Sequence, residues 1–223
     1  MRDVSENTVL ATNQLPKNDR IYYLGNEKAP KRVLIVGNSI TRHGVKQEIG
    51  WYHDHGMAAS APERDFVHLL QEKWREKGVD VLTMVSQCAT WERGLNDPDI
   101  LQSFTAERDF NADVVLFRLG ENVSTQTDMA QFAKALRSFL AQIAPKNKLV
   151  LTTTVWRNEP LNEELRRAAA ELGAPLCDLQ AVGSEDALMA IGLFEHKGVA
   201  MHPGDKGMAY IADAVFPALL AAL

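Results

Sequence analysis

The sequence contains few cysteines and no long apolar run. Only Cys88 and Cys177 occur among 223 residues, far apart and outside any Cys-x-x-Cys pattern. This argues against a disulfide framework or a structural zinc site. No stretch reaches the ~20 apolar residues of a membrane helix, and the first residues lack the apolar segment of a secretory signal. We therefore expect a cytoplasmic protein that does not bind membranes.

Basic residues are outnumbered by acidic ones. The formal net charge is −5, and lysine and arginine form no dense run, so the chain has no basic surplus for binding nucleic-acid phosphates. The nucleotide-binding patterns G-x-G-x-x-G and G-x-x-x-x-G-K-[ST] are also absent. We expect neither a nucleic-acid partner nor a nucleotide cofactor.

The length suits one sizeable α/β domain that buries its core without disulfides or metals. Residues 1–30 are polar and aperiodic, and we interpret them as an extended arm packed on a single domain, 31–223. Five apolar runs within that domain are typical of buried strands, and they alternate with helical patterns, which favours a parallel sheet. The runs are 32–36, 79–85, 113–119, 149–155 and 175–179.

Helical patterns separate these strands. The sequence from Ser60 to Glu63 is typical of a capping box that opens a helix ending at Gly78. Apolar residues at three- and four-residue steps predict further helices, and a nearly all-apolar segment predicts a last helix packed on the sheet. These three helices are predicted over 129–143, 161–172 and 207–223.

Three short segments combine a serine, an asparagine and a histidine. Ser39 follows the first predicted strand and Asn122 the third, so both should lie at the carboxyl edge of the sheet, where ligands bind in this class of fold. His202 precedes the last predicted helix. Acyl transfer by serine needs a hydroxyl, a base and neutral donors for the developing oxyanion, and these residues supply them.

The chain resembles the SGNH (GDSL) hydrolases from about Arg32 to the C-terminus. The matching blocks are Gly37-Asn38-Ser39-Ile40, Gly120-Glu121-Asn122, and His202-Pro203 followed by Gly207. The resemblance implies a three-layer α/β/α sandwich with a mainly parallel five-stranded sheet of flavodoxin-like topology. It also implies that Ser39 is the nucleophile, His202 the general base and acid, and Asn122 an oxyanion donor together with the Ser39 backbone N–H.

The blocks depart from the family pattern at three positions. Asn38 replaces the usual aspartate of block one, and Val199 stands where an aspartate normally orients the histidine. That leaves a serine–histidine dyad, a backbone carbonyl, or an acid from elsewhere, for which Glu195 is the nearest candidate. The loop 85–91 lacks the block-two glycine; a backbone N–H of 87–89 can replace it, with Cys88 as our prediction, although a small core residue fits Cys88 equally well.

Aromatic residues near these blocks suggest substrate contacts. Trp51, Trp91 and Glu121 are predicted to contact substrate, with core or lid packing as an equal alternative for the two tryptophans. The segment 51–57 contains two histidines and one aspartate, too few ligands for a zinc site, so no metal is expected.

The sequence therefore predicts a serine esterase that needs no cofactor. It would remove a short acyl group, such as acetyl, from a carbohydrate or another small alcohol. The alternatives are an inactive ligand-binding protein with the same fold, or a thioesterase or lipase of the same family. The sequence does not specify the oligomeric state.

Overall fold

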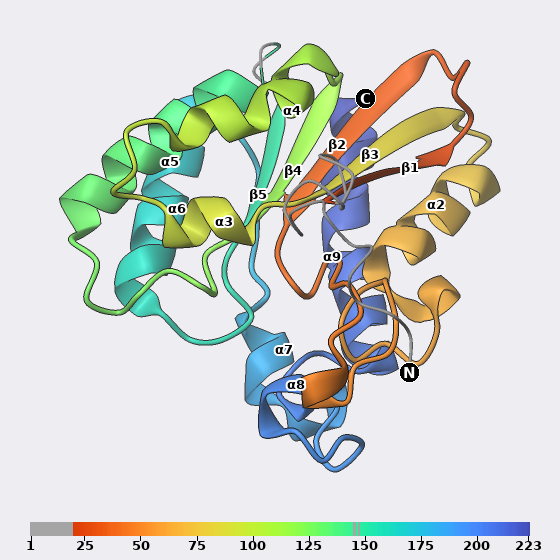
Figure 1. The fold of residues 1–223 in the computed structure, drawn as a ribbon. Coiled ribbons are helices and arrows are strands. Elements are labelled where there is room, and N and C mark those ends of the chain that lie inside the picture. The colour runs from red at the N-terminus through yellow and green to blue at the C-terminus, as the bar shows by residue number, and fades with distance from the viewer. Residues whose placement is uncertain (1–19, 145, 147) are drawn as a thin grey trace, which may run out of the picture.

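The computed structural model describes residues 20–144, 146 and 148–223. Within them, one sheet has the strand order β1-β3-β2-β4-β5-β6 (Figure 1). The strands are β1 (Ile21–Gly25), β2 (Lys31–Gly37), β3 (Val81–Gln87), β4 (Val114–Arg118), β5 (Leu149–Thr152) and β6 (Leu176–Cys177).

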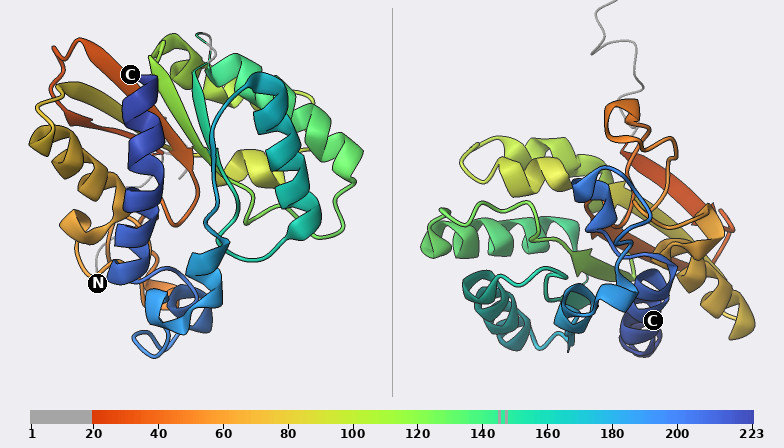
Figure 2. Two further views of the ribbon diagram at one scale, coloured as in Figure 1. Left: turned by 180° about the vertical axis from the view of Figure 1, so that it is seen from behind. Right: turned by 90° about the horizontal axis from the view of Figure 1, so that it is seen from below.

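Helices cover both faces of this sheet. Those with an α-helical pattern are α2 (Phe66–Glu76), α3 (Ala89–Arg93), α4 (Thr105–Asp109), α5 (Met129–Ile143), α6 (Glu159–Leu172), α7 (Gln180–Ser184), α8 (Lys197–Ala200) and α9 (Asp205–Ala222). Short 3-10 turns are η2 (Gln47–Ile49), η3 (Pro62–Arg64), η4 (Ile100–Phe104) and η5 (Asp186–Leu188). Helices α3 to α6 lie on one face, and α2 and α9 on the other (Figure 2).

The sheet confirms the predicted α/β sandwich with mainly parallel strands. Strands β2 to β6 run parallel, and β2 and β4 are nearly continuous apolar runs because helices bury both of their faces. The sheet has six strands rather than five, since β1 adds an antiparallel edge strand with Tyr22 opposite Val85. This strand lies in the predicted arm 1–30, of which residues 1–19 are outside the described residues.

The predicted start of the first long helix is wrong. Asp65 is the N-cap of α2, because its carboxylate accepts a hydrogen bond from the His68 N–H at 2.8 Å. Ser60 instead donates its hydroxyl to Asp205 at the start of α9, over 2.7 Å. The capping-box pattern was misleading because Ser60 binds a different helix from the one that follows it.

The later helices lie close to their predicted positions. Helix α5 has the predicted bounds, and α6 ends before Gly173, which adopts a left-handed φ of 60°. Helix α9 buries residues such as Ile211 and Val215 against the sheet, as predicted. None of the helices in the described part of the chain has the length and apolarity needed to span a membrane.

Strand β2 lies between β3 and β4 in the sheet, although both of these strands follow it in the sequence. The chain order therefore reverses between β2 and β4, and in open α/β sheets the loops at the carboxyl ends of the strands bind ligands at such a point. Ser39 follows β2 by two residues, and Asn122 follows β4 by four. The sheet topology thus brings the predicted serine and asparagine to the same edge.

Candidate active site

Ser39 and His202 are in direct contact. The Oγ of Ser39 lies 2.8 Å from Nε2 of His202, although 163 positions separate the two residues. Ser39 lies in a tight turn, in which the Thr41 N–H donates to the Asn38 carbonyl at 2.9 Å. Gly37 permits this turn, because a Cβ there would overlap the Thr41 side chain.

His202 lies between α8 and α9, and its Nδ1 faces the backbone of α8. Its Nδ1 lies 2.7 Å from the Gly198 carbonyl, and its side chain is almost fully buried. Because a carbonyl only accepts, Nδ1 carries the proton and Nε2 is left as an acceptor for the Ser39 hydroxyl. The Trp156 ring packs edge-on against the imidazole, with ring centres 5.3 Å apart, and limits its rotation.

The side chain at the position of the usual aspartate offers the histidine ring no acceptor, and Val199 binds His202 only through its carbonyl, which accepts the His202 backbone N–H at 2.9 Å. Val199 is fully buried in a small apolar cluster that includes Trp51, Met57 and Ala190. The structure does not bring Glu195 to His202 either: Glu195 is exposed, and Nδ1 contacts Gly198 instead. Of the three alternatives left open by the sequence, this geometry corresponds to the backbone carbonyl.

Burial makes His202 hard to protonate. Its pKa falls from 6.5 to about 4, chiefly through burial, and the charges of His43 and Arg118 act in the same direction. The hydrogen bond to Gly198 and the charge of Glu121 oppose this shift. His202 is therefore neutral at pH 7, and its Nε2 keeps the lone pair that accepts the Ser39 hydroxyl.

Asn122 lies at the turn after β4 and is held from two sides. Gly120 has a φ of 142°, and a Cβ there would clash with Thr154, so this turn requires glycine. The Asn122 Nδ2 donates to Glu92 at 2.6 Å, and its Oδ1 accepts from Arg93 at 3.1 Å. The amide nitrogen and oxygen thus have fixed positions.

A buried cluster of charges supports both loops. The Asn38 Nδ2 donates to Glu121 at 2.6 Å and to Glu92 at 3.1 Å, while its Oδ1 accepts from Arg118. An aspartate in this position would add a third carboxylate and lose both donors. The departure at Asn38 therefore has a local explanation, because the site already contains two buried acids.

Glu121 does not reach the surface to contact substrate. Its side chain is 1% exposed and pairs with Arg118 at 2.7 Å. Burial acts to raise the pKa of Glu121, but the charge and hydrogen bonds of Arg118, together with hydrogen bonds from Val155 and Asn38, outweigh it and the pKa is lowered. Burial, and then the charge of Glu121, raise the pKa of Glu92. The predicted substrate contact at Glu121 is thus an internal ion pair.

The predicted oxyanion donor at Cys88 is already engaged. The Cys88 N–H donates to the Gly37 carbonyl at 2.6 Å, which ties the loop after β3 to β2. The Cys88 side chain is fully buried, as its alternative interpretation as a core residue implied. The Ser39 N–H, by contrast, has no acceptor in the described part of the chain.

Both predicted substrate tryptophans are core residues. Trp51 is fully buried and donates its indole N–H to the His43 carbonyl at 2.9 Å. Trp91 is also fully buried and stacks on Phe139, with ring centres 4.7 Å apart. Their apolar surroundings made core packing more favourable than exposure.

No cluster of three or more metal-ligating side chains occurs among residues 20–144, 146 and 148–223.

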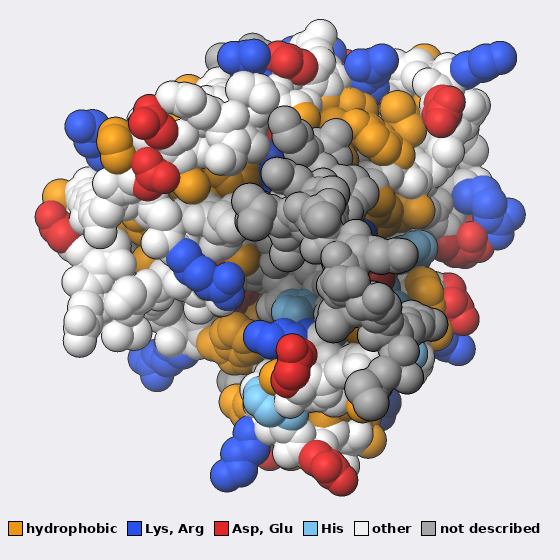
Figure 3. Space-filling view, in the orientation of Figure 1, with side chains coloured by type: hydrophobic (Ala, Val, Ile, Leu, Met, Phe, Trp, Pro, Cys, Tyr) orange, Lys and Arg blue, Asp and Glu red, His pale blue; other side chains and the backbone are white. Residues whose placement is uncertain are grey.

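Two clefts flank the loops that carry the site. One of about 480 Å³ lies beside Asn122 and Arg93. Another of about 590 Å³ lies beside His43 and Lys46. On the face shown in Figure 3, histidine, lysine and arginine side chains lie close together below the middle of the view.

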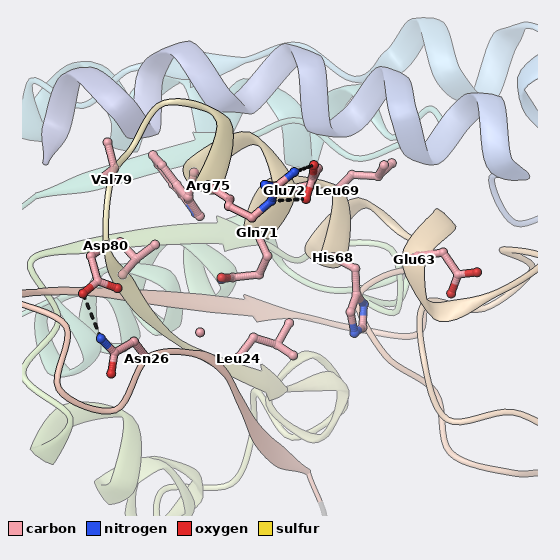
Figure 4. A pocket seen from close by; sticks show the side chains of 13 residues that line it. Leu24, Asn26, Glu63, His68, Leu69, Gln71, Glu72, Arg75, Val79 and Asp80 are labelled. Carbon is pink, nitrogen blue, oxygen red and sulfur yellow. Dashed lines mark hydrogen bonds and ion pairs between the residues drawn. The ribbon is translucent and has the colours of Figure 1, made fainter.

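A further cavity lies away from this centre. It has a volume of about 590 Å³ between α2 and β1, and Leu24, His68 and Gln71 line it (Figure 4). The ion pair between Arg75 and Glu72 lies at its rim (Figure 4). Ser39, Asn122 and His202 are not among its lining residues, so we place the candidate site at the carboxyl edge of the sheet.

Comparison of the sequence with family models and with curated proteins gives no match. Solved structures are similar at probability 1.00. A lipase/acylhydrolase from Enterococcus faecalis has a TM-score of 0.57 and 18% identity, covering 84% of this chain and 94% of that protein. A member of the lipolytic protein G-D-S-L family from Veillonella parvula has a TM-score of 0.53 and 15% identity over 85% of this chain and 98% of that one. The chain has the GDSL fold.

A carbohydrate esterase is similar to the chain in structure as well. A family two carbohydrate esterase from Clostridium thermocellum has a TM-score of 0.58 and 13% identity, covering 89% of this chain and 66% of that protein. These identities are low, so the likeness concerns the architecture. The GDSL fold predicted from three short blocks is thereby confirmed.

Sequence reasoning missed three residues of the site. Glu92 and Arg93 lie on a short helix after β3, and Gly198 supplies a carbonyl. Arg118 at the end of β4 was considered as a substrate contact or an exposed loop residue, but it is fully buried and pairs with Glu121. A backbone acceptor leaves no signal in the residue type. Glu92 did carry a sequence signal, because it is a charged residue close to an apolar run and to the loop that replaces block two.

Proposed function

We propose that the protein is a serine ester hydrolase of the SGNH type. It removes a short acyl group, such as acetyl, from a carbohydrate or another small alcohol. The observation that carries the proposal is the 2.8 Å contact between Ser39 Oγ and the unprotonated Nε2 of His202. A hydroxyl hydrogen-bonded to a neutral imidazole is the arrangement from which acyl transfer starts.

In the first step, Ser39 Oγ attacks the ester carbonyl carbon while its proton passes to His202 Nε2. The carbonyl π electrons move to oxygen, and the resulting oxyanion accepts hydrogen bonds from the Ser39 N–H and Asn122 Nδ2. The intermediate then collapses, the bond to the alcohol oxygen breaks, and that oxygen takes the proton from Nε2. An acyl-serine and a free alcohol result.

In the second step, water replaces the alcohol. His202 Nε2 accepts a proton from water as the water oxygen attacks the acyl carbon, and the same donors hold the second oxyanion. Collapse breaks the bond to Ser39 Oγ, which regains its proton from Nε2. The carboxylic acid leaves, and no cofactor takes part in either step.

The cleft beside Asn122 supports a polar alcohol as the leaving group. Amide and hydroxyl side chains dominate its lining, and such groups form hydrogen bonds with sugar hydroxyls. They are Asn96, Ser124, Gln126, Thr127 and Gln131. The carbohydrate esterase among the structural neighbours is in keeping with this substrate class.

Hydrolysis of 4-nitrophenyl acetate and butyrate tests the proposal. The purified protein is compared with Ser39→Ala and with Ser184→Ala, a control at an exposed helical serine. We expect Ser39→Ala to fall to background while Ser184→Ala keeps the wild-type rate, with circular dichroism confirming that each protein is folded. Acetylated sugars then replace the nitrophenyl esters.

The alternative of an inactive binding protein makes a different prediction. The wild type would match Ser39→Ala at background with every ester, including acetylated sugars. A faster rate with butyrate than with acetate, or with a thioester, would instead favour a lipase or a thioesterase.

A further inference from the structure

The carboxylate of Glu92 is surrounded by four donors from the two catalytic loops. Its Oε1 accepts the Gly120 N–H at 2.6 Å, the Asn38 amide at 3.1 Å and the Asn122 N–H at 3.3 Å. Its Oε2 accepts the Asn122 Nδ2 at 2.6 Å. The residue is 2% exposed, so water does not compete for these bonds.

We propose that Glu92 is a positioning residue that holds the Asn122 amide in its oxyanion-binding orientation. This inference rests on the proposed esterase function, in which Asn122 donates to the oxyanion. Glu92 borders the cleft beside Asn122 but is 2% exposed, and in this role it acts through Asn122 rather than on the reacting atoms.

The orientation of Asn122 matters because an amide can turn by 180° and exchange its oxygen and nitrogen. Only one orientation places Nδ2 against the Glu92 carboxylate. The second hydrogen of Nδ2 is then left for the oxyanion, and Arg93 binds Oδ1 on the other side of the amide. An anion and a cation thus fix the two ends of the Asn122 side chain.

Glu92 also accounts for the missing block-two glycine. The loop after β3 does not supply a donor at Cys88, because the Gly37 carbonyl takes that N–H. The same segment instead continues into α3, which carries Glu92 on its buried side. This part of the chain therefore acts on the oxyanion site through Asn122 rather than directly.

The substitution Glu92→Gln tests this role with a minimal change in shape. The introduced amide oxygen can replace Oε1, which accepts three donors, but the introduced amide nitrogen then faces Asn122 Nδ2, and two donors meet. Asn122 turns away or moves. We expect kcat to fall by about 100- to 1,000-fold, as for loss of an oxyanion donor, with little change in KM.

A comparison of the two single variants with the double variant distinguishes a positioning role of Glu92 from a general loss of structure. Asn122→Ala should lose about as much kcat as Glu92→Gln, and the double variant should lose little more, since both act through one amide. Glu164→Gln is the matched control, because this similarly buried carboxylate pairs with Arg137 on α5, away from Asn122. It should lower stability and leave kcat near the wild-type value.

A charge-conserving swap separates folding from catalysis. When Glu92→Gln is combined with Asn122→Asp, the new amide at position 92 donates to the new carboxylate at position 122, and the network keeps its net charge. We expect the melting temperature to recover relative to Glu92→Gln. The value of kcat should stay low, because a carboxylate at position 122 has no N–H to offer the oxyanion.

The outcomes are distinct. Glu92→Gln with kcat near the wild type, or losses that add fully with Asn122→Ala, would overturn the positioning role while Ser39-dependent hydrolysis remains. Recovery of kcat in the swap would overturn it as well. A wild type without Ser39-dependent hydrolysis of any ester would overturn the proposed function, and with it the role assigned to Glu92.

Discussion

The Nδ1 of His202 lies 2.7 Å from the carbonyl oxygen of Gly198. This carbonyl takes the place of the aspartate that orients the histidine in the resembled family. A carbonyl fixes the ring tautomer as well as a carboxylate does, but it carries only a partial charge. The protonated imidazole is therefore less stabilised than in a full triad. The pKa of about 4 for His202, set mainly by burial, is in keeping with a histidine oriented by a carbonyl.

The fall of the pH–rate profile in acid should reflect the low pKa of His202. Protonated His202 is unable to accept the Ser39 proton, so the loss of activity that is due to His202 is centred near a pH of about 4, well below the ordinary pKa of 6.5. We expect kcat/KM to stay constant from neutral pH down past 6.5. The profile is measured with an ester stable in acid, and a limb near 6.5 would contradict the buried histidine.

Protonation of Glu92 should cause a second loss of activity, at a pH above the one at which His202 is protonated. Burial raises the pKa of Glu92, and its protonation would remove an acceptor from Asn122. In Glu92→Gln the residual activity should show the His202 limb alone, shifted to lower pH. The two profiles are compared in the same buffers.

Protonation of His202 should also couple to folding. The unfolded chain binds this proton near pH 6.5 and the folded chain near 4, so the unfolded state binds more protons between these values. Stability is then full above 6.5 and falls by about 3 kcal/mol as the pH drops to 4. Urea unfolding of the wild type and of His202→Asn measures this, and the variant should have the shallower dependence on pH. Equal slopes would contradict it.

Restoring the family aspartate in block one should destabilise the protein. Asn38→Asp removes two hydrogen-bond donors and places a third carboxylate beside Glu92 and Glu121. We expect a loss of about 3 kcal/mol at about pH 7, and less at about pH 5, where the cluster can take up a proton. Asn26→Asp is the matched control, because Asn26 also donates to a carboxylate, that of Asp80, but is exposed. Equal losses in both variants would show that burial is not the cause.

Restoring the aspartate of block five should not create a triad. Val199→Asp places a charge in the apolar cluster with Trp51, while Nδ1 of His202 already binds Gly198. We expect a loss of several kcal/mol in stability and no gain in kcat. Val199→Thr keeps the shape and tests polarity alone. A rise in kcat for Val199→Asp would show that the loop can rearrange to use the acid.

The parts of the fold that depend on repeated patterns could be predicted. Apolar strand runs and the three-residue steps of α5 each involve many side chains, so they predicted the parallel sheet and its helices. The antiparallel β1 was missed because Ile21–Gly25 is half exposed at a sheet edge. Ser60 misled because the partner of a capping side chain can lie elsewhere in the fold.

The parts of the candidate site that could be predicted are those in which the residue type itself indicates the chemistry. Ser39 and His202 were predicted as a pair and lie in contact. Trp51, Trp91 and Glu121 were misplaced because neither a ring nor a carboxylate in a loop reveals whether it faces solvent. The role of Gly198 depends on a carbonyl that every residue has, so only coordinates could locate it.

The contact between Ser39 and His202 has a consequence for folding kinetics. It joins residues 163 positions apart, the first shortly after β2 and the second shortly before α9. Contacts of such long range form late, since the loop-closure entropy must be overcome first. Recovery of ester hydrolysis after dilution from urea therefore reports that the segments around β2 and α9 have come together, and should lag behind the burial of Trp91, which packs on Phe117 and Phe139.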